Sequence, residues 1–293
     1  MSKKLRGGDP KSASPSKPKI LIYGLPGVGK TYGCLDFPGV YYIDTEGGAD
    51  LGHYTDKLRA SGAAYMGPDD GACDFPTVLE EIQTLATTDH QYRTLVIDSF
   101  SKLFNSQVAA TQERMERAGE IDAFGASKKE AIKYTRRMVA WMSRLDMNVI
   151  LICHQKSEWK DGKEVGVTFD AWDKLAYELH LCLRIAKQGQ SRKAFIGKTR
   201  LLAFPESEAF DWSYSEFAKR YGKEIMETQA KAAVVATPEQ IAEYSRLITF
   251  AKQDVREKWD AACPDVATLD RDQMAKRLEW LNKQAAAAAT PAT

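Results

Sequence analysis

Eight consecutive residues near the N-terminus have the types and spacing of a phosphate-binding loop. The stretch GLPGVGKT fits the pattern G-x-x-x-x-G-K-[ST], between an apolar run and a helical pattern. Its glycines let backbone N–H groups point at phosphate oxygens, and the helix N-terminus adds positive charge. The lysine reaches the β and γ phosphates, and the threonine hydroxyl binds Mg²⁺. The sequence therefore predicts a site for ATP and Mg²⁺ at Gly24, Leu25, Pro26, Gly27, Val28, Gly29, Lys30 and Thr31.

Polar side chains follow three later apolar runs. Asp98 ends the run LVID, where a carboxylate can hold Mg²⁺ through water. Gln155 follows the run VILICH, and it is a candidate sensor of the γ phosphate. Glu46 follows the run VYYID and precedes two glycines, which fits either a polar strand exit or a catalytic base.

The elements that must position these residues alternate along the chain. Apolar runs at residues 19–24, 40–44, 94–98 and 148–154 predict buried strands. Helical patterns begin at Lys30 and cover about 77–86, 102–117 and 127–145, the last with a capping box of Ser127 and Glu130. This alternation predicts an α/β fold with a mostly parallel sheet that is covered on both faces.

The pattern changes after residue 174. Residues 175–180 are predicted helical, and residues 181–198 are predicted to form a β-hairpin with Gly189 in the turn. Thr237 is predicted to cap a helix that runs to about Trp259, and a second helix covers about 270–284. The expected domains are a disordered basic arm (1–17), an ATPase core (18–235), a C-terminal helical pair (236–285) and a tail (286–293).

The composition limits the classes of protein. The 293 residues have a formal net charge of +1, so any basic surface must be local. No apolar run is long enough for a membrane span, and the N-terminus has no apolar segment of a secretory signal. The five cysteines are scattered, with no CxxC pair, which favours a reduced, cytoplasmic compartment.

Three motifs in order, YYIDTEGG, LVIDS and ICHQ, resemble the RecA/RadA recombinase ATPase core when they follow GLPGVGKT. The resemblance implies that Glu46 is the general base that orients the attacking water. It gives Asp98 the Mg²⁺ role and Gln155 the sensor role. His154 departs from that family, which usually has asparagine before the sensor glutamine.

Longer stretches are similar to compact phage RecA-like ATPases implicated in single-strand annealing and recombination. They are FPGVYYIDTEGG, FDAWDKLAYELH and GKTRL, and the likeness covers about Lys19 to Phe204. The resemblance implies single-stranded DNA as a partner, a homo-oligomer (ring or short filament) with ATP at subunit interfaces, and a single-strand-binding protein as a further partner. For a phage protein, the compartment is the host cytoplasm.

Six basic residues and no acidic residue lie between Leu179 and Pro205. Alternate residues of a hairpin strand share a face, so Lys198 and Arg200 are expected to point the same way. The resemblance implies that these two are fingers that reach the γ phosphate of a neighbouring subunit. The alternative is a solvated basic hairpin.

Two loops are candidate contacts for single strands. One covers residues 118–127 and precedes a basic helix start, and the other covers residues 156–172, where lysines alternate with tryptophans. Lysines follow phosphates while an aromatic ring stacks on a base. The predicted nucleic-acid residues are Lys156, Trp159, Lys160, Arg192 and Lys193.

These observations favour an ATPase whose nucleotide state controls binding to single-stranded DNA. Its predicted catalytic residues are Glu46, Lys30, Gln155, Lys198 and Arg200. Three alternatives stay open: an ATP-dependent replication accessory such as a helicase or loader, a nucleotide-gated DNA-binding module with negligible hydrolysis, and a small-molecule P-loop kinase.

Overall fold

The computed structural model describes residues 16–48, 52–123 and 125–289. Within these residues nine strands form one sheet. The strands are β1 (Lys19–Gly24), β2 (Val40–Asp44), β3 (Ala64–Met66), β4 (Thr94–Asp98), β5 (Asn148–Lys160), β6 (Lys163–Phe169), β7 (Leu181–Gln188), β8 (Ser191–Thr199) and β9 (Ala209–Asp211).

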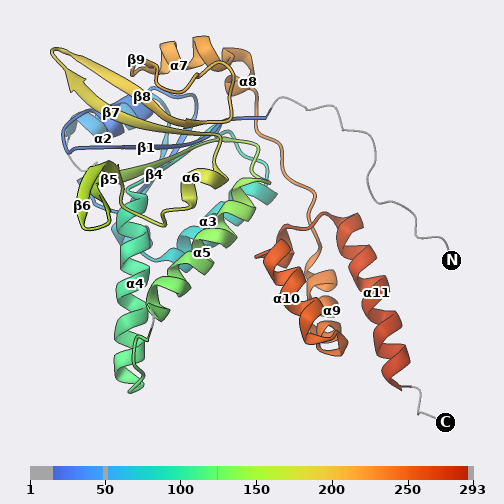
Figure 1. The fold of residues 1–293 in the computed structure, drawn as a ribbon. Coiled ribbons are helices and arrows are strands. Elements are labelled where there is room, and N and C mark those ends of the chain that lie inside the picture. The colour runs from blue at the N-terminus through green and yellow to red at the C-terminus, as the bar shows by residue number, and fades with distance from the viewer. Residues whose placement is uncertain (1–15, 49–51, 124, 290–293) are drawn as a thin grey trace.

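The helices cover both faces of the sheet and form a group at the C-terminus (Figure 1). They are α1 (Lys30–Cys34), α2 (Gly52–Ala60), α3 (Phe75–Thr87), α4 (Phe100–Arg117), α5 (Ala126–Met142), α6 (Leu175–Glu178), α7 (Tyr214–Tyr221), α8 (Lys223–Glu227), α9 (Pro238–Leu247), α10 (Gln253–Ala262) and α11 (Arg271–Ala289). No helix in the described part of the chain has the length and apolar character needed to cross a bilayer.

The strand order is β3-β2-β4-β5-β1-β7-β8-β9, and β6 pairs with β5. Pairs from β3 to β7 are parallel, whereas β8, β9 and β6 join in antiparallel pairs. One apolar core packs the sheet against α3, α4 and α5, and another packs it against α1, α2, α7 and α8. The predicted α/β fold with a mostly parallel sheet and a β-hairpin is confirmed.

The C-terminal helices have an apolar core of their own, which includes Leu247, Met274 and Leu281. Asp265 connects this group to α5, because its carboxylate accepts hydrogen bonds from Arg137 and Trp141, both at 3.1 Å. The prediction of a single helix from Thr237 to Trp259 is wrong. A 3-10 turn at Ile248–Phe250 ends α9, where β-branched residues of low helix propensity follow one another.

Two further boundaries differ from the prediction. Lys17, which was assigned to the arm, is buried, and its ammonium group donates to the carbonyl oxygen of Asp146 at 3.0 Å. The rest of the predicted arm, residues 1–15, lies outside the described residues. The predicted tail begins inside α11, because a run of alanines continues the helix to Ala289.

The predicted capping box at Ser127 is wrong. The helix begins one residue earlier, after Gly125 in a left-handed conformation with φ 67°. Ser127 instead donates from its backbone N–H and its hydroxyl to the carboxylate of Asp122, at 3.0 Å and 2.7 Å. These bonds lower the pKa of Asp122. An aspartate before the helix therefore does the work expected of the serine.

Candidate active site

The parallel parts of four strands reach one edge of the sheet, where β1, β2 and β4 end and β5 continues into its pair with β6. The register places Asp44 beside Asp98, and Gly24 beside His154. Side chains that lie at this edge or just beyond it on these four strands therefore meet there, as is general for the carboxyl ends of parallel strands. This edge holds most of the residues that the motifs predicted.

The phosphate loop connects β1 to α1. Gly27 and Gly29 have φ values of 73° and 86°, a conformation that favours glycine. The ammonium group of Lys30 donates to the carbonyl oxygens of Gly24 and Leu25, both at 2.9 Å. Burial lowers the pKa of Lys30, and the Asp98 and Glu46 carboxylates oppose that shift. Lys30 is thus held over the loop, within reach of a bound anion.

Thr31 and Asp98 form the candidate Mg²⁺ position. The threonine hydroxyl donates to Oδ2 of Asp98 at 2.5 Å, and the Tyr42 hydroxyl donates to the same oxygen at 2.9 Å. Burial raises the pKa of Asp98, although these two bonds counter the shift. A hydroxyl and one carboxylate fit Mg²⁺, which completes its shell with phosphate oxygens and water. In the described residues no cluster of three or more metal-ligating side chains exists.

Asp44 shapes the turn that carries Glu46. Its Oδ1 accepts the backbone N–H groups of Glu46 at 3.0 Å and Gly47 at 2.9 Å. Tyr65 donates to the other carboxylate oxygen at 3.2 Å. An aspartate that accepts hydrogen bonds from the next two or three residues stabilises a turn. The two carboxylates at the end of β2 therefore differ, since Asp44 supports the backbone of the turn and Glu46 projects from it.

The Glu46 carboxylate is held at one oxygen. The Ser99 hydroxyl donates to Oε1 at 2.5 Å, and Nε2 of His154 lies 2.6 Å from the same atom. Ser99 also caps α4, where its hydroxyl accepts the Lys102 N–H at 3.2 Å. Within the described residues Oε2 has no hydrogen-bond partner. The side chain is therefore oriented and keeps one oxygen for a further ligand such as water.

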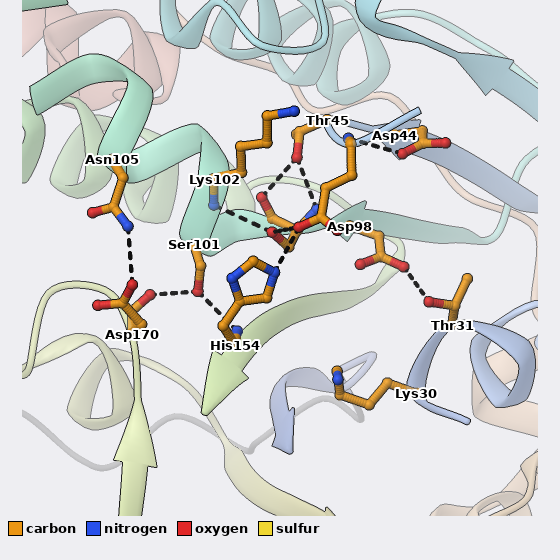
Figure 2. A network of polar contacts seen from close by, with 12 residues as sticks. Lys30, Thr31, Asp44, Thr45, Asp98, Ser101, Lys102, Asn105, His154 and Asp170 are labelled. Carbon is orange, nitrogen blue, oxygen red and sulfur yellow. Dashed lines mark hydrogen bonds and ion pairs between the residues drawn. The ribbon is translucent and has the colours of Figure 1, made fainter. Parts of the chain in front are cut away.

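A chain of polar contacts connects His154 to the end of β6 (Figure 2). The backbone N–H of His154 donates to the Ser101 hydroxyl at 2.9 Å, and that hydroxyl donates to the backbone carbonyl oxygen of Asp170 at 2.5 Å. Asn105 holds the Asp170 carboxylate at 2.9 Å. The motifs indicated His154 only as a departure from a pattern. The structure makes it a direct contact of Glu46.

Gln155 does not join this cluster. It is half-buried and lies opposite Phe169 in the β5–β6 pair. In the described part of the chain its side chain makes no hydrogen bond. Neighbouring residues of a strand point to opposite faces, so His154 and Gln155 face different ways. The sensor role of Gln155 stays a prediction.

Lys198 and Arg200 lie at the other end of the sheet. Lys198 is paired with Cys182, which is paired with Leu21 near the start of β1. Their side chains donate to the carbonyl oxygens of Leu179 and Tyr177. They do not join the phosphate loop of their own chain. Their role as fingers stays a prediction.

Residues 156–172, predicted as a loop, mostly form a hairpin, so that prediction is wrong. β5 continues to Lys160, and β6 returns from Lys163. Valine, threonine and phenylalanine in β6 favour a strand, and Gly162 with φ 76° makes the turn. At the tip Trp159 is 65% exposed, and Lys160 is exposed beside it.

The predicted nucleic-acid lysines and arginine separate into different surroundings. Lys156 is paired with Asp170 at 3.5 Å and Asp173 at 3.6 Å. Lys193 is paired with Asp211 at 2.9 Å. Arg192 lies against Gly29, where a Cβ atom would fall 2.3 Å from its Nε. Of the three predicted lysines, Lys160 at the tip of the β5–β6 hairpin is the one that forms no ion pair within the described residues.

Comparison with known proteins gives a family. A family model described as an AAA domain matches residues 16–236. No curated protein matches the chain. Among solved structures 139 chains match. One of them, the crystal structure of the RadB recombinase, has a TM-score of 0.44 and 18% identity, with 66% of this chain and 86% of that chain covered. Because the family model covers more than half of the sequence, this chain belongs to the AAA domain family.

Proposed function

We propose that the protein binds ATP with Mg²⁺ at the phosphate loop and hydrolyses it. One observation carries the proposal: Lys30, the Thr31–Asp98 pair and the oriented Glu46 carboxylate meet at one edge of the sheet. The AAA domain family supports it, because this loop pattern binds nucleotide phosphates. The RecA-like assignment comes from the motifs YYIDTEGG, LVIDS and ICHQ.

The residues have distinct tasks in this reaction. Lys30 exchanges its two carbonyl acceptors for phosphate oxygens. Thr31 and Asp98 would hold Mg²⁺, which would supply positive charge to balance that of the phosphates. Glu46 accepts a proton from water through its unpartnered oxygen. The water oxygen bonds to the γ phosphorus as the bond to the bridging oxygen breaks, which gives ADP and phosphate. Ser99 and His154 keep the carboxylate in place meanwhile.

We propose that the tip of the β5–β6 hairpin binds single-stranded DNA. Trp159 offers an exposed ring for stacking, and Lys160 offers a charge without an acidic partner in the described residues. β5 carries His154 at the ATP site and Trp159 at the tip, so one strand joins the two sites. This continuity supports control of DNA binding by nucleotide, in phage-type recombination or single-strand annealing.

Assembly is part of the same proposal. Lys198 and Arg200 would act only on the nucleotide of a neighbouring subunit, because they lie away from their own phosphate loop. A homo-oligomer with ATP at its interfaces would supply that contact. A single-strand-binding protein is proposed as a further partner from the resemblance alone.

One alternative keeps an observation in its favour. A nucleotide-gated binding module with little hydrolysis fits the hydrogen bonds that Ser99 and His154 make to Glu46, because they occupy one of the two carboxylate oxygens that a base could use. A helicase or loader would share the same chemistry. A small-molecule kinase would transfer the phosphate to an acceptor other than water.

Phosphate release tests the proposal. Wild type and Lys30→Ala are compared with and without single-stranded DNA, and the products are identified. We expect free phosphate from wild type, stimulation by DNA, and loss of ATP binding in Lys30→Ala. Wild type that binds ATP without releasing phosphate would favour the binding module. A phosphorylated small molecule would favour the kinase.

A further inference from the structure

Three glycines of the phosphate loop and its helix are sites of close approach by β7, β8 and the segment after β9. A Cβ atom on Gly24 would lie 2.2 Å from the carbonyl oxygen of Ile185. A Cβ atom on Gly33 would lie 2.3 Å from Nε1 of Trp212. Real Cβ atoms essentially never lie so close to other heavy atoms. The absence of a side chain at these glycines therefore lets the neighbouring segments approach the loop closely. The hairpin is therefore packed directly on the nucleotide loop.

The third glycine, Gly29, lies against the side chain of Arg192. A Cβ atom on Gly29 would lie 2.3 Å from Nε, 2.6 Å from Cδ and 3.3 Å from Cζ of Arg192. Gly29 directly precedes Lys30, and its φ of 86° belongs to the loop conformation that exposes N–H groups to an anion. The guanidinium of Arg192 thus lies over the loop whose shape selects phosphate.

The hairpin backbone fixes this position. Arg192 pairs with Lys187 across β7 and β8, and its carbonyl accepts the Trp212 N–H at 2.8 Å. Trp212 is itself buried between α1 and Phe37. The centroids of the Trp212 and Phe37 rings lie 6.2 Å apart. The backbone of Arg192 is therefore fixed in place, although its side chain is exposed.

The charge of Arg192 has no partner within the described residues. The nearest acidic residue on β9, Asp211, pairs with Lys193 instead at 2.9 Å. A guanidinium has five N–H donors in a planar fork that suits phosphate oxygens. We infer that Arg192 is a phosphate-binding residue of its own chain, which adds a third cationic contact to those of Lys30 and Mg²⁺. This inference rests on the proposed ATP site.

Arg192 is thereby assigned to the nucleotide rather than to single-stranded DNA. An arginine in the same chain can stabilise phosphate charge as one from a neighbour does. Because the contact is with phosphate and not with the base, the inference covers nucleoside triphosphates and inorganic tripolyphosphate alike.

The test is ATP affinity by calorimetry for wild type, Arg192→Ala, Arg192→Lys and Lys187→Ala. Lys187→Ala removes the same charge from the facing position of the hairpin. We expect Arg192→Ala to bind ATP roughly 10- to 100-fold more weakly, the range for a lost charge-assisted contact. Arg192→Lys should recover part of the affinity. Lys187→Ala should stay within about threefold of wild type, since a nearby solvated charge contributes little. Competition by tripolyphosphate should weaken in parallel with ATP.

Several outcomes would overturn the inference. Equal losses in Arg192→Ala and Lys187→Ala would mean that only the general charge of the hairpin matters. Unchanged ATP affinity with weaker binding of a single strand in the absence of nucleotide would make Arg192 a DNA contact. Wild type that fails to bind ATP would instead reject the proposed function. Thermal unfolding of each variant shows whether a loss reflects misfolding, and Arg192→Lys remains informative if Arg192→Ala unfolds.

Discussion

The β5–β6 and β7–β8 hairpins both extend from the carboxyl-end edge of the sheet, and they differ in what they contact (Figure 1). The β7–β8 hairpin is packed on the phosphate loop at Gly24 and Gly29. At its base the β5–β6 hairpin contacts Glu46 through His154, and its tip with Trp159 is exposed. Both hairpins carry basic residues, but the β5–β6 hairpin also carries acidic ones, and the two have different surroundings. In the proposed mechanism one hairpin contacts phosphate, and the other contacts the Glu46 carboxylate.

Removing the exposed ring of Trp159 on the β5–β6 hairpin should have a larger effect on DNA binding than removing His154 has on kcat. Base stacking on an aromatic ring contributes about 1–3 kcal/mol, so Trp159→Ala should bind a single strand roughly tenfold more weakly or worse. The measurement is fluorescence anisotropy of a labelled oligonucleotide at fixed salt. Phe250→Ala is the control, because Phe250 is also exposed and lies in the C-terminal helical group. Equal affinities of wild type and Trp159→Ala would remove this hairpin from the DNA surface.

Removing the contact between His154 and Glu46 at the base of that hairpin should have a smaller effect, on kcat. His154 orients Glu46 without touching the phosphate in the proposed mechanism. His154→Ala should therefore lower kcat about threefold to tenfold and leave the KM for ATP unchanged. His154→Asn, which keeps an N–H donor, should recover part of kcat. A change in KM alone would show that His154 acts in ATP binding, and would contradict a positioning role.

Local patterns predicted the parts of the site that are local in sequence. The spacing of Lys30 and Thr31 within one loop, and the exit of Asp98 from an apolar strand, need only the element that carries them. The contact between His154 and Glu46 joins residues 108 positions apart, so it depends on strand order. The position of Arg192 depends on the register between β7 and β8. A shift of one residue in that register would turn the Arg192 side chain to the other face of the sheet.

Errors in the predicted elements have similar causes. The sequence of residues 156–172 was rich in lysine and glutamate, and its charges concealed the alternation of a solvated hairpin. The helix break at Ile248–Phe250 has no glycine or proline to mark it. Trp212 could not be assigned without the fold, because its place beside Gly33 arises from β9 and α1 together.

The most direct test of the account is the Glu46→Gln variant. It keeps the shape of the side chain and the acceptor for Ser99, and it removes the base. ATP hydrolysis and ATP affinity are measured together, with Glu113→Gln on the exposed face of α4 as the control. We predict that Glu46→Gln binds ATP within about threefold of wild type and hydrolyses it at least roughly 100-fold more slowly. Hydrolysis at the wild-type rate would contradict the assignment of Glu46 as the base.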